Sequence, residues 1–249
     1  MTTSSIKANT KIIKVITLDL DNTLWLTMPV IARANETLHK YISEKYPTIA
    51  KRFPPSTWRP LQDKIMETHP EFKTDFTKIR KSAIEYCATQ CNLENPSAIS
   101  NEVFDIFINE RCNTKDFLFP NVIKTLQVLK DRGIIIGSLS NGNADITKMD
   151  YLNDFFSFNI GSAGKPDQEP FQHAYNLAKE HCKVEINSPN EILHVGDSIY
   201  SDVIPGKQFG FQTVWVRTGE DGGTEEMPKE ADFILDAFDE LVNIFIKKD

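Results

Sequence analysis

Two aspartates, Asp19 and Asp21, stand directly after an apolar, β-branched run at residues 12–18. Such a run is typical of a parallel strand that is buried on both faces. In open α/β sheets ligands bind outside the carboxyl ends of the strands, and alternate residues of a strand share one face. Two carboxylates at one site repel each other unless a cation lies between them or one is protonated, and Mg²⁺ prefers oxygen ligands. The pair therefore indicates either a site for a hard divalent cation or an ordinary turn and helix cap.

A second acidic motif follows another apolar strand, at residues 192–195. Asp197 comes directly after Gly196, a residue that permits close approach of the backbone, and Asp202 lies further along, where a helix starts. By itself the motif could be a helix N-cap. Two acidic strand ends in one parallel sheet make a shared metal site the better interpretation.

Two further motifs are suited to an anion. Ser140, Asn141 and Gly142 follow the predicted strand 134–139 and offer a hydroxyl, an amide and backbone N–H groups ahead of a helix. Lys165 stands between Gly164 and Pro166, and the proline fixes the exit geometry of the lysine. Alone, the first motif is a common turn and the second a solvated charge.

Strand-like and helical segments alternate from residue 117 onward, which predicts an α/β fold: a Rossmann-like parallel sheet covered by helices on both faces. The predicted strands are 12–18, 134–139, 158–160, 192–195, 213–216 and, more weakly, 233–235. The predicted helices are 122–131, 145–153, 169–182, 199–209 and 237–246.

Residues 27–115 break this alternation and carry no convincing strand. Helical segments are expected near 30–46, 57–68, 73–91 and 97–112, the last opened by a turn and N-cap at 95–97. A structureless loop of this length is implausible inside a compact domain. We therefore predict an all-helical cap domain at 27–115, inserted into a core made of 1–26 and 116–249.

Composition excludes several classes of protein. The 249 residues carry 28 Lys and Arg against 35 Asp and Glu, a net charge of −7, and 40% are hydrophobic. A disordered chain and a general nucleic-acid binder are therefore poor interpretations. Four cysteines are too few for a disulfide framework, and no apolar run approaches the about 18 residues of a membrane span. We expect a cytoplasmic protein with no nucleic-acid or membrane partner, and a short flexible tail before the first strand.

Taken together and in order, the motifs DLDNT, SN, K followed by P, and GDSIYSD resemble those of the haloacid dehalogenase (HAD) superfamily of aspartate-nucleophile hydrolases. The resemblance spans essentially the whole core, and the insertion is similar to the helical cap of that superfamily. Residues 28–31, 191–197 and 214–217 resemble, more narrowly, a phosphatase branch that acts on flavin mononucleotide or a pyrimidine phosphate of riboflavin synthesis.

The resemblance implies a role for each motif residue. Asp19 is implied to be the nucleophile that forms an aspartyl-phosphate, and Asp21 the general acid and then the general base. Mg²⁺ is implied to be held by the Asp19 carboxylate, the Asp21 backbone carbonyl and Asp197. The phosphoryl oxygens would be held by Ser140, Asn141 and Lys165, with Asp202 supporting the waters of the metal or Lys165 from outside.

These roles imply a magnesium-dependent phosphoric monoester hydrolase whose substrate is a small phosphorylated metabolite. Dehalogenases of the superfamily lack an acid at the position of Asp21, because a halide leaves without a proton. A phosphomutase, which shares both acids and a similar cap, and a catalytically idle HAD-like binding protein remain alternatives.

Other residues carry weaker signals. Trp25, Trp58, Arg33 and Arg59 could contact a flat base or a phosphate, although packing in the cap or hinge explains each of them as well. His194 lies within an apolar strand and is interpreted as a core histidine.

Overall fold

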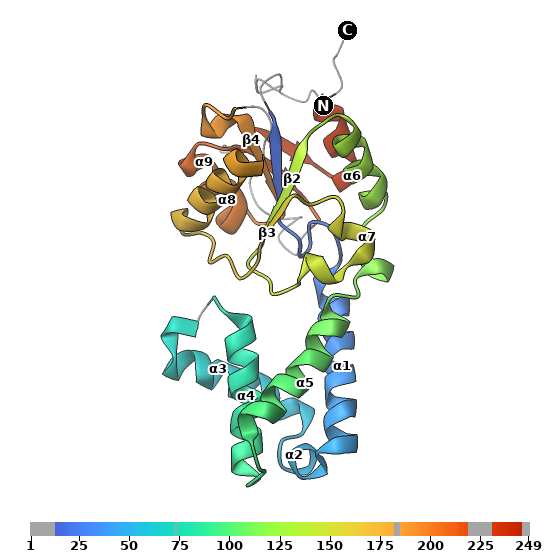
Figure 1. Ribbon diagram of the computed structural model, residues 1–249, viewed down its shortest axis with the longest axis vertical. Coiled ribbons are helices and arrows are strands. Elements are labelled where there is room, and N and C mark those ends of the chain that lie inside the picture. The colour runs from blue at the N-terminus through green and yellow to red at the C-terminus, as the bar shows by residue number, and fades with distance from the viewer. Residues whose placement is uncertain (1–12, 73, 182–184, 219–230, 246–249) are drawn as a thin grey trace. The chain divides into compact units, whose positions relative to one another are not determined.

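The computed structural model describes residues 13–72, 74–181, 185–218 and 231–245, so the predicted N-terminal tail lies outside the described residues. The chain divides into two compact units (Figure 1). An α/β unit contains the described residues of 1–26, 118–142 and 149–249. A helical unit contains the described residues of 27–117 together with 143–148.

One parallel sheet of six strands forms the centre of the α/β unit, and the predicted fold class is confirmed. In their order across the sheet the strands are β3 (Phe158–Ile160), β2 (Ile135–Leu139), β1 (Val15–Leu18), β4 (Ile192–Gly196), β5 (Gln212–Val216) and β6 (Phe233–Leu235). All four residues of β1 are buried, as expected for a central strand that is covered on both faces. Its position between β2 and β4 places the first motif in the middle of the sheet.

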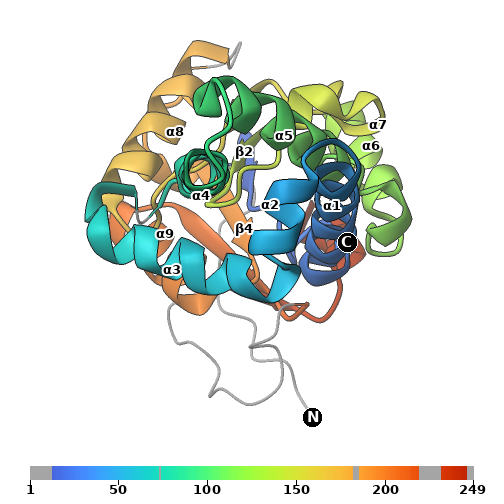
Figure 2. The same cartoon turned by 90° about the horizontal axis from the view of Figure 1, so that it is seen from below.

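Helices cover both faces of this sheet (Figures 1 and 2). On one face α8 (Gln168–His181) buries Phe171, Ala174 and Ala178 against β2 and β3, with α9 (Ile204–Phe209) beside it. On the other face α6 (Val122–Asp131) buries Leu126 and Leu129, which recur at helical spacing. The short helix α7 (Asp150–Asn153) and the 3₁₀ helix Phe238–Phe245 complete the unit.

All regular segments of the helical unit, within the described residues, are helical. The helices are α1 (Thr27–Lys45), α2 (Pro47–Arg52), α3 (Trp58–Thr68), α4 (Phe76–Gln90) and α5 (Pro96–Arg111). Helix α5 packs against α1 and α4, and its predicted apolar stripe, from Ile99 to Ile108, is buried. Helix α4 begins at a capped end, because the Asp75 carboxylate accepts the Lys78 N–H at 2.9 Å.

Several predicted elements differ from the structure. The helix predicted at 145–153 is wrong: a 3₁₀ turn at Ile146–Lys148 belongs to the helical unit, and α7 begins separately after Met149. The helix predicted at 199–209 begins as a π-helical turn, Ile199–Val203, before α9. The segment predicted at 237–246 is a 3₁₀ helix. Asn95 precedes α5, but its side chain makes no capping hydrogen bond.

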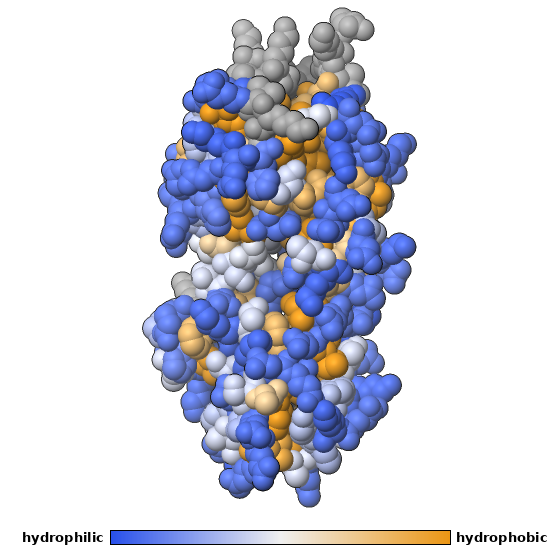
Figure 3. Space-filling model, viewed as in Figure 1, coloured by the Kyte–Doolittle hydropathy of each residue, from blue (hydrophilic) through white to orange (hydrophobic). Residues whose placement is uncertain are grey.

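In the part of the chain that the structure describes, no helix is both long enough and apolar enough to span a bilayer. The face seen in Figure 3 is mostly hydrophilic, with hydrophobic residues exposed in scattered patches.

Candidate active site

Asp19 lies at the carboxyl end of β1, where the three central strands of the sheet end together. Its backbone N–H donates to the Val195 carbonyl at 2.8 Å and continues the β1–β4 ladder one residue past the strand. Leu18 is in register with Val195 on one side and with Ser138 on the other. The segments that follow β1, β2 and β4 therefore emerge at one edge of the sheet.

Lys165 reaches this edge from the loop after β3. Its Nζ lies 2.9 Å from Oδ1 of Asp19 and also forms a short ion pair with Oδ1 of Asp202. Asn141 holds the lysine in place through two reciprocal bonds, because its Oδ1 accepts the Lys165 N–H at 2.7 Å and its Nδ2 donates to the Lys165 carbonyl at 2.9 Å. The Lys165–Pro166 peptide bond is cis. Lys165 thus links the nucleophile candidate to the acidic motif after β4.

Asp202, the last residue of that motif, is buried, and different groups contact its two oxygens. Oδ1 accepts from Lys165 and lies 3.1 Å from Nε2 of His194, while Oδ2 accepts the Ser198 N–H at 3.1 Å. Nδ1 of His194 lies 2.9 Å from the Thr17 hydroxyl. A Cβ atom on Gly196 would lie 2.3 Å from Cγ of Asp202, so this position requires glycine. The close approach predicted at Gly196 is made by the Asp202 carboxylate.

Asp197 lies beside Asp19, and the Thr23 hydroxyl lies between the two carboxylates. The Thr23 hydroxyl is 3.5 Å from Oδ2 of Asp19 and 3.5 Å from Oδ1 of Asp197. The Trp215 indole donates to the Asp197 carbonyl at 2.9 Å and fixes the backbone there. One oxygen from each of Asp19, Asp197 and Asp202 lies within 4.8 Å of the others, so these residues could hold a metal ion.

The pKa values of these groups follow from burial and from one shared cation. Burial raises the pKa of Asp19 to about 6, against the lowering effect of Lys165. Burial, then the charges of Asp19 and Asp202, raise the pKa of Asp197 to about 8. Burial alone would also raise the pKa of Asp202, but Lys165 and His194 lower it to about 2. Burial opposes the charge of Lys165, yet the two carboxylates hold its pKa above the ordinary value.

This donor set fits a hard divalent cation. Three buried or half-buried carboxylates lie near the ammonium of Lys165, which forms ion pairs with Asp19 and Asp202 and lowers the pKa of Asp197 less than burial and the other two carboxylates raise it. A second cation near Asp19 and Asp197 would remove the repulsion that raises both pKa values. Carboxylate oxygens are the ligands that Mg²⁺ prefers.

The other predicted site residues lie in the adjoining loops. Ser140 is buried and its Oγ accepts the Gly142 N–H at 3.2 Å, so the hydroxyl stabilises its own turn. Asp21 is half-buried, and its Oδ1 accepts the Trp25 indole N–H at 2.9 Å. Direct contacts of Lys165 therefore join Asp19, Asn141 and Asp202, while phosphate binding by Ser140 and Asn141 stays a prediction.

Sequence reasoning missed three hydrogen-bond contacts around the motif residues. They are the contact of Trp25 with Asp21, that of His194 with Asp202 and that of Thr17 with His194. His194 is buried, as expected of a core histidine, but it also contacts the Asp202 carboxylate. One signal was present for Thr17, which lies two residues before Asp19 and so on the same face of the strand. Thr17 and His194 are register partners in β1 and β4, a pairing that only the sheet order reveals.

The four residues considered for base or phosphate contacts are engaged within the fold. Trp25 is completely buried, and Trp58 is buried with its indole donating to the Phe53 carbonyl at 3.0 Å. Arg33 forms an ion pair with Glu110, and Arg59 pairs on the surface with Asp63. These contacts favour structural roles for all four.

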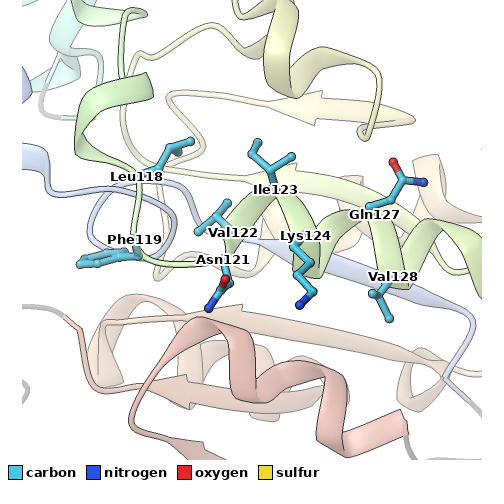
Figure 4. Close-up of a pocket in the computed structure, with 8 residues that line it drawn as sticks. All are labelled: Leu118, Phe119, Asn121, Val122, Ile123, Lys124, Gln127 and Val128. Carbon is cyan, nitrogen blue, oxygen red and sulfur yellow. The ribbon is translucent and has the colours of Figure 1, made fainter.

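A separate cavity of about 600 Å³ lies along α6 (Figure 4). Its lining is mainly apolar, from Leu118, Phe119, Asn121, Val122, Ile123, Lys124, Gln127 and Val128. It contains one ionisable side chain, Lys124, and no carboxylate. The cavity therefore lacks the groups for the chemistry that the strand-end cluster can perform.

Comparison with known proteins identifies the class of protein. The sequence model of one family, described as haloacid dehalogenase-like hydrolase, matches residues 13–210. The chain belongs to this family, and the predicted resemblance is confirmed.

Two characterised relatives extend over most of the chain. The 5-amino-6-(5-phospho-D-ribitylamino)uracil phosphatase YigB of Escherichia coli (strain K12) is 27% identical over 205 residues, 82% of this chain and 84% of its own. The glyceraldehyde 3-phosphate phosphatase of Pyrococcus furiosus is 26% identical over 239 residues, 93% of this chain and 92% of its own. The names of these relatives support the predicted class of enzyme, a phosphoric monoester hydrolase.

Solved structures show the same fold. A 2-haloacid dehalogenase from Pseudomonas syringae pv. Tomato DC3000 matches with a TM-score of 0.81 and 26% identity, over 94% of this chain and 98% of its own. A HAD phosphatase from Thermococcus onnurineus matches with a TM-score of 0.61 and 20% identity, over 94% and 98%. Because a dehalogenase and a phosphatase share this fold, the fold alone does not distinguish a substrate that is a phosphate ester from one that is an organic halide. The site residues must make that distinction.

Proposed function

We propose that this chain is a magnesium-dependent phosphatase that hydrolyses a small phosphorylated metabolite through an aspartyl-phosphate on Asp19. The observation that carries the proposal is the buried contact of 2.9 Å between Lys165 and Asp19, within reach of the carboxylate of Asp197. This arrangement supplies a nucleophile, a fixed cation and an acceptor for a second cation. In this proposal the helical unit serves as the cap.

In the first half-reaction a carboxylate oxygen of Asp19 attacks phosphorus, and the bond to the leaving oxygen breaks. Asp21 gives its proton to that oxygen. Lys165 keeps Asp19 oriented and places a positive charge where the phosphoryl oxygens gain negative charge. In the second half-reaction water attacks the phosphorus of the aspartyl-phosphate, the bond between phosphorus and the Asp19 oxygen breaks, and Asp21 takes up the proton, so that inorganic phosphate leaves and the Asp19 carboxylate is restored.

Asp19, Asp197 and the backbone carbonyl of Asp21 would hold Mg²⁺. When bound, the ion supplies charge neutralisation between the anionic nucleophile and the anionic substrate, and polarises the phosphoryl group. Asp202 is already paired with Lys165 and His194, so in this proposal it orients the lysine.

Asp21 favours a phosphate ester over an organic halide. A departing alkoxide needs a proton, whereas a halide leaves as a stable anion and needs none. A dehalogenase would gain nothing from a carboxyl group at this place, and the structure gives that group a defined hydrogen-bond partner, Trp25.

For the substrate we propose an alkyl phosphate on a polyol chain, such as flavin mononucleotide or 5-amino-6-(5-phosphoribitylamino)uracil. The relative YigB, named as a phosphatase of the second compound, supports this choice. The proposed location is cytoplasmic.

A screen of phosphorylated metabolites tests the proposal. It includes these two compounds, glyceraldehyde 3-phosphate, phosphoglycolate, sugar phosphates and nucleotides, each with Mg²⁺ and with EDTA. We expect Mg²⁺-dependent release of inorganic phosphate, with the two ribityl phosphates among the fastest substrates. Isomerised product without free phosphate would instead identify a phosphomutase. Absence of both turnover and a Mg²⁺-dependent thermal shift would identify a binding protein.

A further inference from the structure

The residues after Asp21 fold back on it in one tight turn. The N–H groups of Thr23 and Leu24 donate to the Leu20 carbonyl at 3.2 and 2.8 Å, and the Asn22 N–H donates to the Trp25 carbonyl at 2.9 Å. Asn22 adopts a positive φ of 57°, a conformation that asparagine tolerates better than most residues. The turn brings Trp25 beside Asp21.

The returning chain is fixed within the α/β unit. Trp25 forms an antiparallel bridge with Leu118, and the Phe119 N–H donates to the Leu24 carbonyl at 3.0 Å. The indole itself is completely buried. Trp25 therefore has a defined position from which its single donor, Nε1, reaches Oδ1 of Asp21 at 2.9 Å.

This bond makes the two oxygens of Asp21 chemically different. The indole N–H can only donate, and the oxygen of a carboxyl group that carries no proton is the better acceptor. When Asp21 carries the proton that it transfers, Oδ1 therefore accepts from Trp25 and Oδ2 carries that proton.

We propose that Trp25 is a positioning residue for proton transfer, which fixes the Asp21 carboxyl and assigns the transferred proton to Oδ2. This inference rests on the proposed function, in which Asp21 serves the leaving group. When the phosphorus–oxygen bond breaks, the proton moves from Oδ2 to the leaving oxygen, and Oδ2 becomes anionic. When water attacks the phosphorus and the bond from phosphorus to Asp19 breaks, Oδ2 takes up one proton of that water, and the carboxyl returns to its first state.

The test compares two esters that differ in their need for this proton. One is p-nitrophenyl phosphate, whose nitrophenolate leaves without protonation, and the other is the fastest alkyl phosphate of the metabolite screen. For Trp25→Phe we expect kcat/KM, which reports the step in which the leaving group departs, to fall about 10–100-fold on the alkyl ester and less than about threefold on p-nitrophenyl phosphate. The ratio of the two kcat/KM values, measured on one preparation, does not depend on how much of the variant is folded.

Trp25→His separates the donor from the bulk of the ring. Nε2 of an imidazole occupies the same ring position as the indole Nε1, so this variant keeps a donor but loses the six-membered ring. We expect it to restore the rate ratio to within about threefold of wild type although it melts at a lower temperature than Trp25→Phe. Trp58→Phe, which also removes a buried indole donor but in the helical unit, measures how much such a change lowers the melting temperature.

A double-variant comparison completes the test. In an Asp21→Asn background, Trp25→Phe should leave the rate ratio unchanged, because the group that it positions is gone. Equal losses on both esters in the Trp25→Phe single variant, or an unchanged ratio, would overturn the role of Trp25 while the wild-type turnover still supports the proposed function. A wild-type chain that hydrolyses neither ester would overturn the proposed function itself.

Discussion

Nζ of Lys165 lies 2.9 Å from Oδ1 of Asp19, and both side chains are buried. The same ammonium pairs with Asp202, so a single cation serves two carboxylates that have little access to water. Breaking a buried pair by removing one partner leaves an uncompensated charge, which costs far more than the pair itself contributes. The stability of the fold and the chemistry of the site therefore depend on the same lysine.

Lys165→Met should lower the free energy of unfolding by about 3–5 kcal/mol, because it leaves Asp19 and Asp202 without their cation. Urea denaturation of the metal-free protein measures the change. Lys207→Met is the matched control, since Lys207 pairs with Asp232 at 2.5 Å with 42% of its side chain exposed. An exposed pair contributes about 0–1 kcal/mol. Equal midpoints for Lys165→Met and wild type would contradict this account of the buried pair.

Asp19→Asn should reduce phosphate release by at least about 10³-fold, because the amide oxygen of asparagine is a poor nucleophile. The variant should remain folded, since Lys165 keeps its pair with Asp202. Release of p-nitrophenol and of inorganic phosphate measures the rate, and thermal unfolding checks the fold. Asp63→Asn, which removes a surface carboxylate paired with Arg59, should keep wild-type activity. Activity near the wild-type value in Asp19→Asn would rule out the aspartyl-phosphate.

Sequence reasoning predicted those parts of the site that follow from strand order. Asp19 and Asp197 each end an apolar strand, and the carboxyl ends of parallel strands must meet at one edge. The contact between Trp25 and Asp21 depends on a six-residue turn, and the contact between His194 and Thr17 depends on which strand lies beside β1. Neither is visible in a linear pattern.

The helix wrongly predicted at 145–153 also shows what a linear pattern cannot reveal. Its apolar residues recur at helical spacing, but spacing cannot show a break such as the one at Met149, where the backbone leaves the helical region. The two halves then pack in different units. Long periodic segments such as α5 were predicted well because one buried face fixes the whole helix.

Mg²⁺ binding should strengthen as pH rises from 6 to 8 and then level off. In the metal-free protein the pKa of Asp197 is raised from 3.8 to about 8, mainly by burial, so below pH 8 the ion must displace a proton from this carboxyl. One displaced proton corresponds to about a tenfold change in apparent affinity per pH unit. Titrations of the thermal shift with Mg²⁺ at several pH values measure the slope, and a pH-independent affinity would contradict the role of Asp197.

Asp197→Asn should make the metal-free protein more stable above pH 8. A pKa raised in the folded state means that ionisation opposes folding, so the cost of Asp197 grows as pH rises from 3.8 and is complete above about 8. Asparagine removes this charge, and a gain of about 1 kcal/mol corresponds to roughly 2–4 °C in Tm. The same variant should lose the Mg²⁺-dependent shift. A lower Tm than wild type at pH 9 without metal would show that the carboxylate is stabilised by a partner other than the ion.

His194→Leu should lower both activity and stability through Asp202. Nε2 of His194 faces a carboxylate and therefore donates, and the neutral ring that burial favours then accepts the Thr17 hydroxyl at Nδ1. Leucine removes the donor to Asp202 and leaves the buried hydroxyl without this acceptor, a loss of about 1–3 kcal/mol. With Asp202 less constrained, Lys165 loses its fixed position, and we expect kcat to fall about tenfold.

His194→Gln separates the two roles of the ring, because its amide nitrogen can reach the place of Nε2 but cannot replace Nδ1. We expect kcat within about threefold of wild type and a free energy of unfolding between those of wild type and His194→Leu. Thr17→Val, which removes only the hydroxyl, should lower stability and leave kcat nearly unchanged. Equal kcat values for the Leu and Gln variants would show that His194 only fills space, since the two side chains differ chiefly in the hydrogen bond to Asp202.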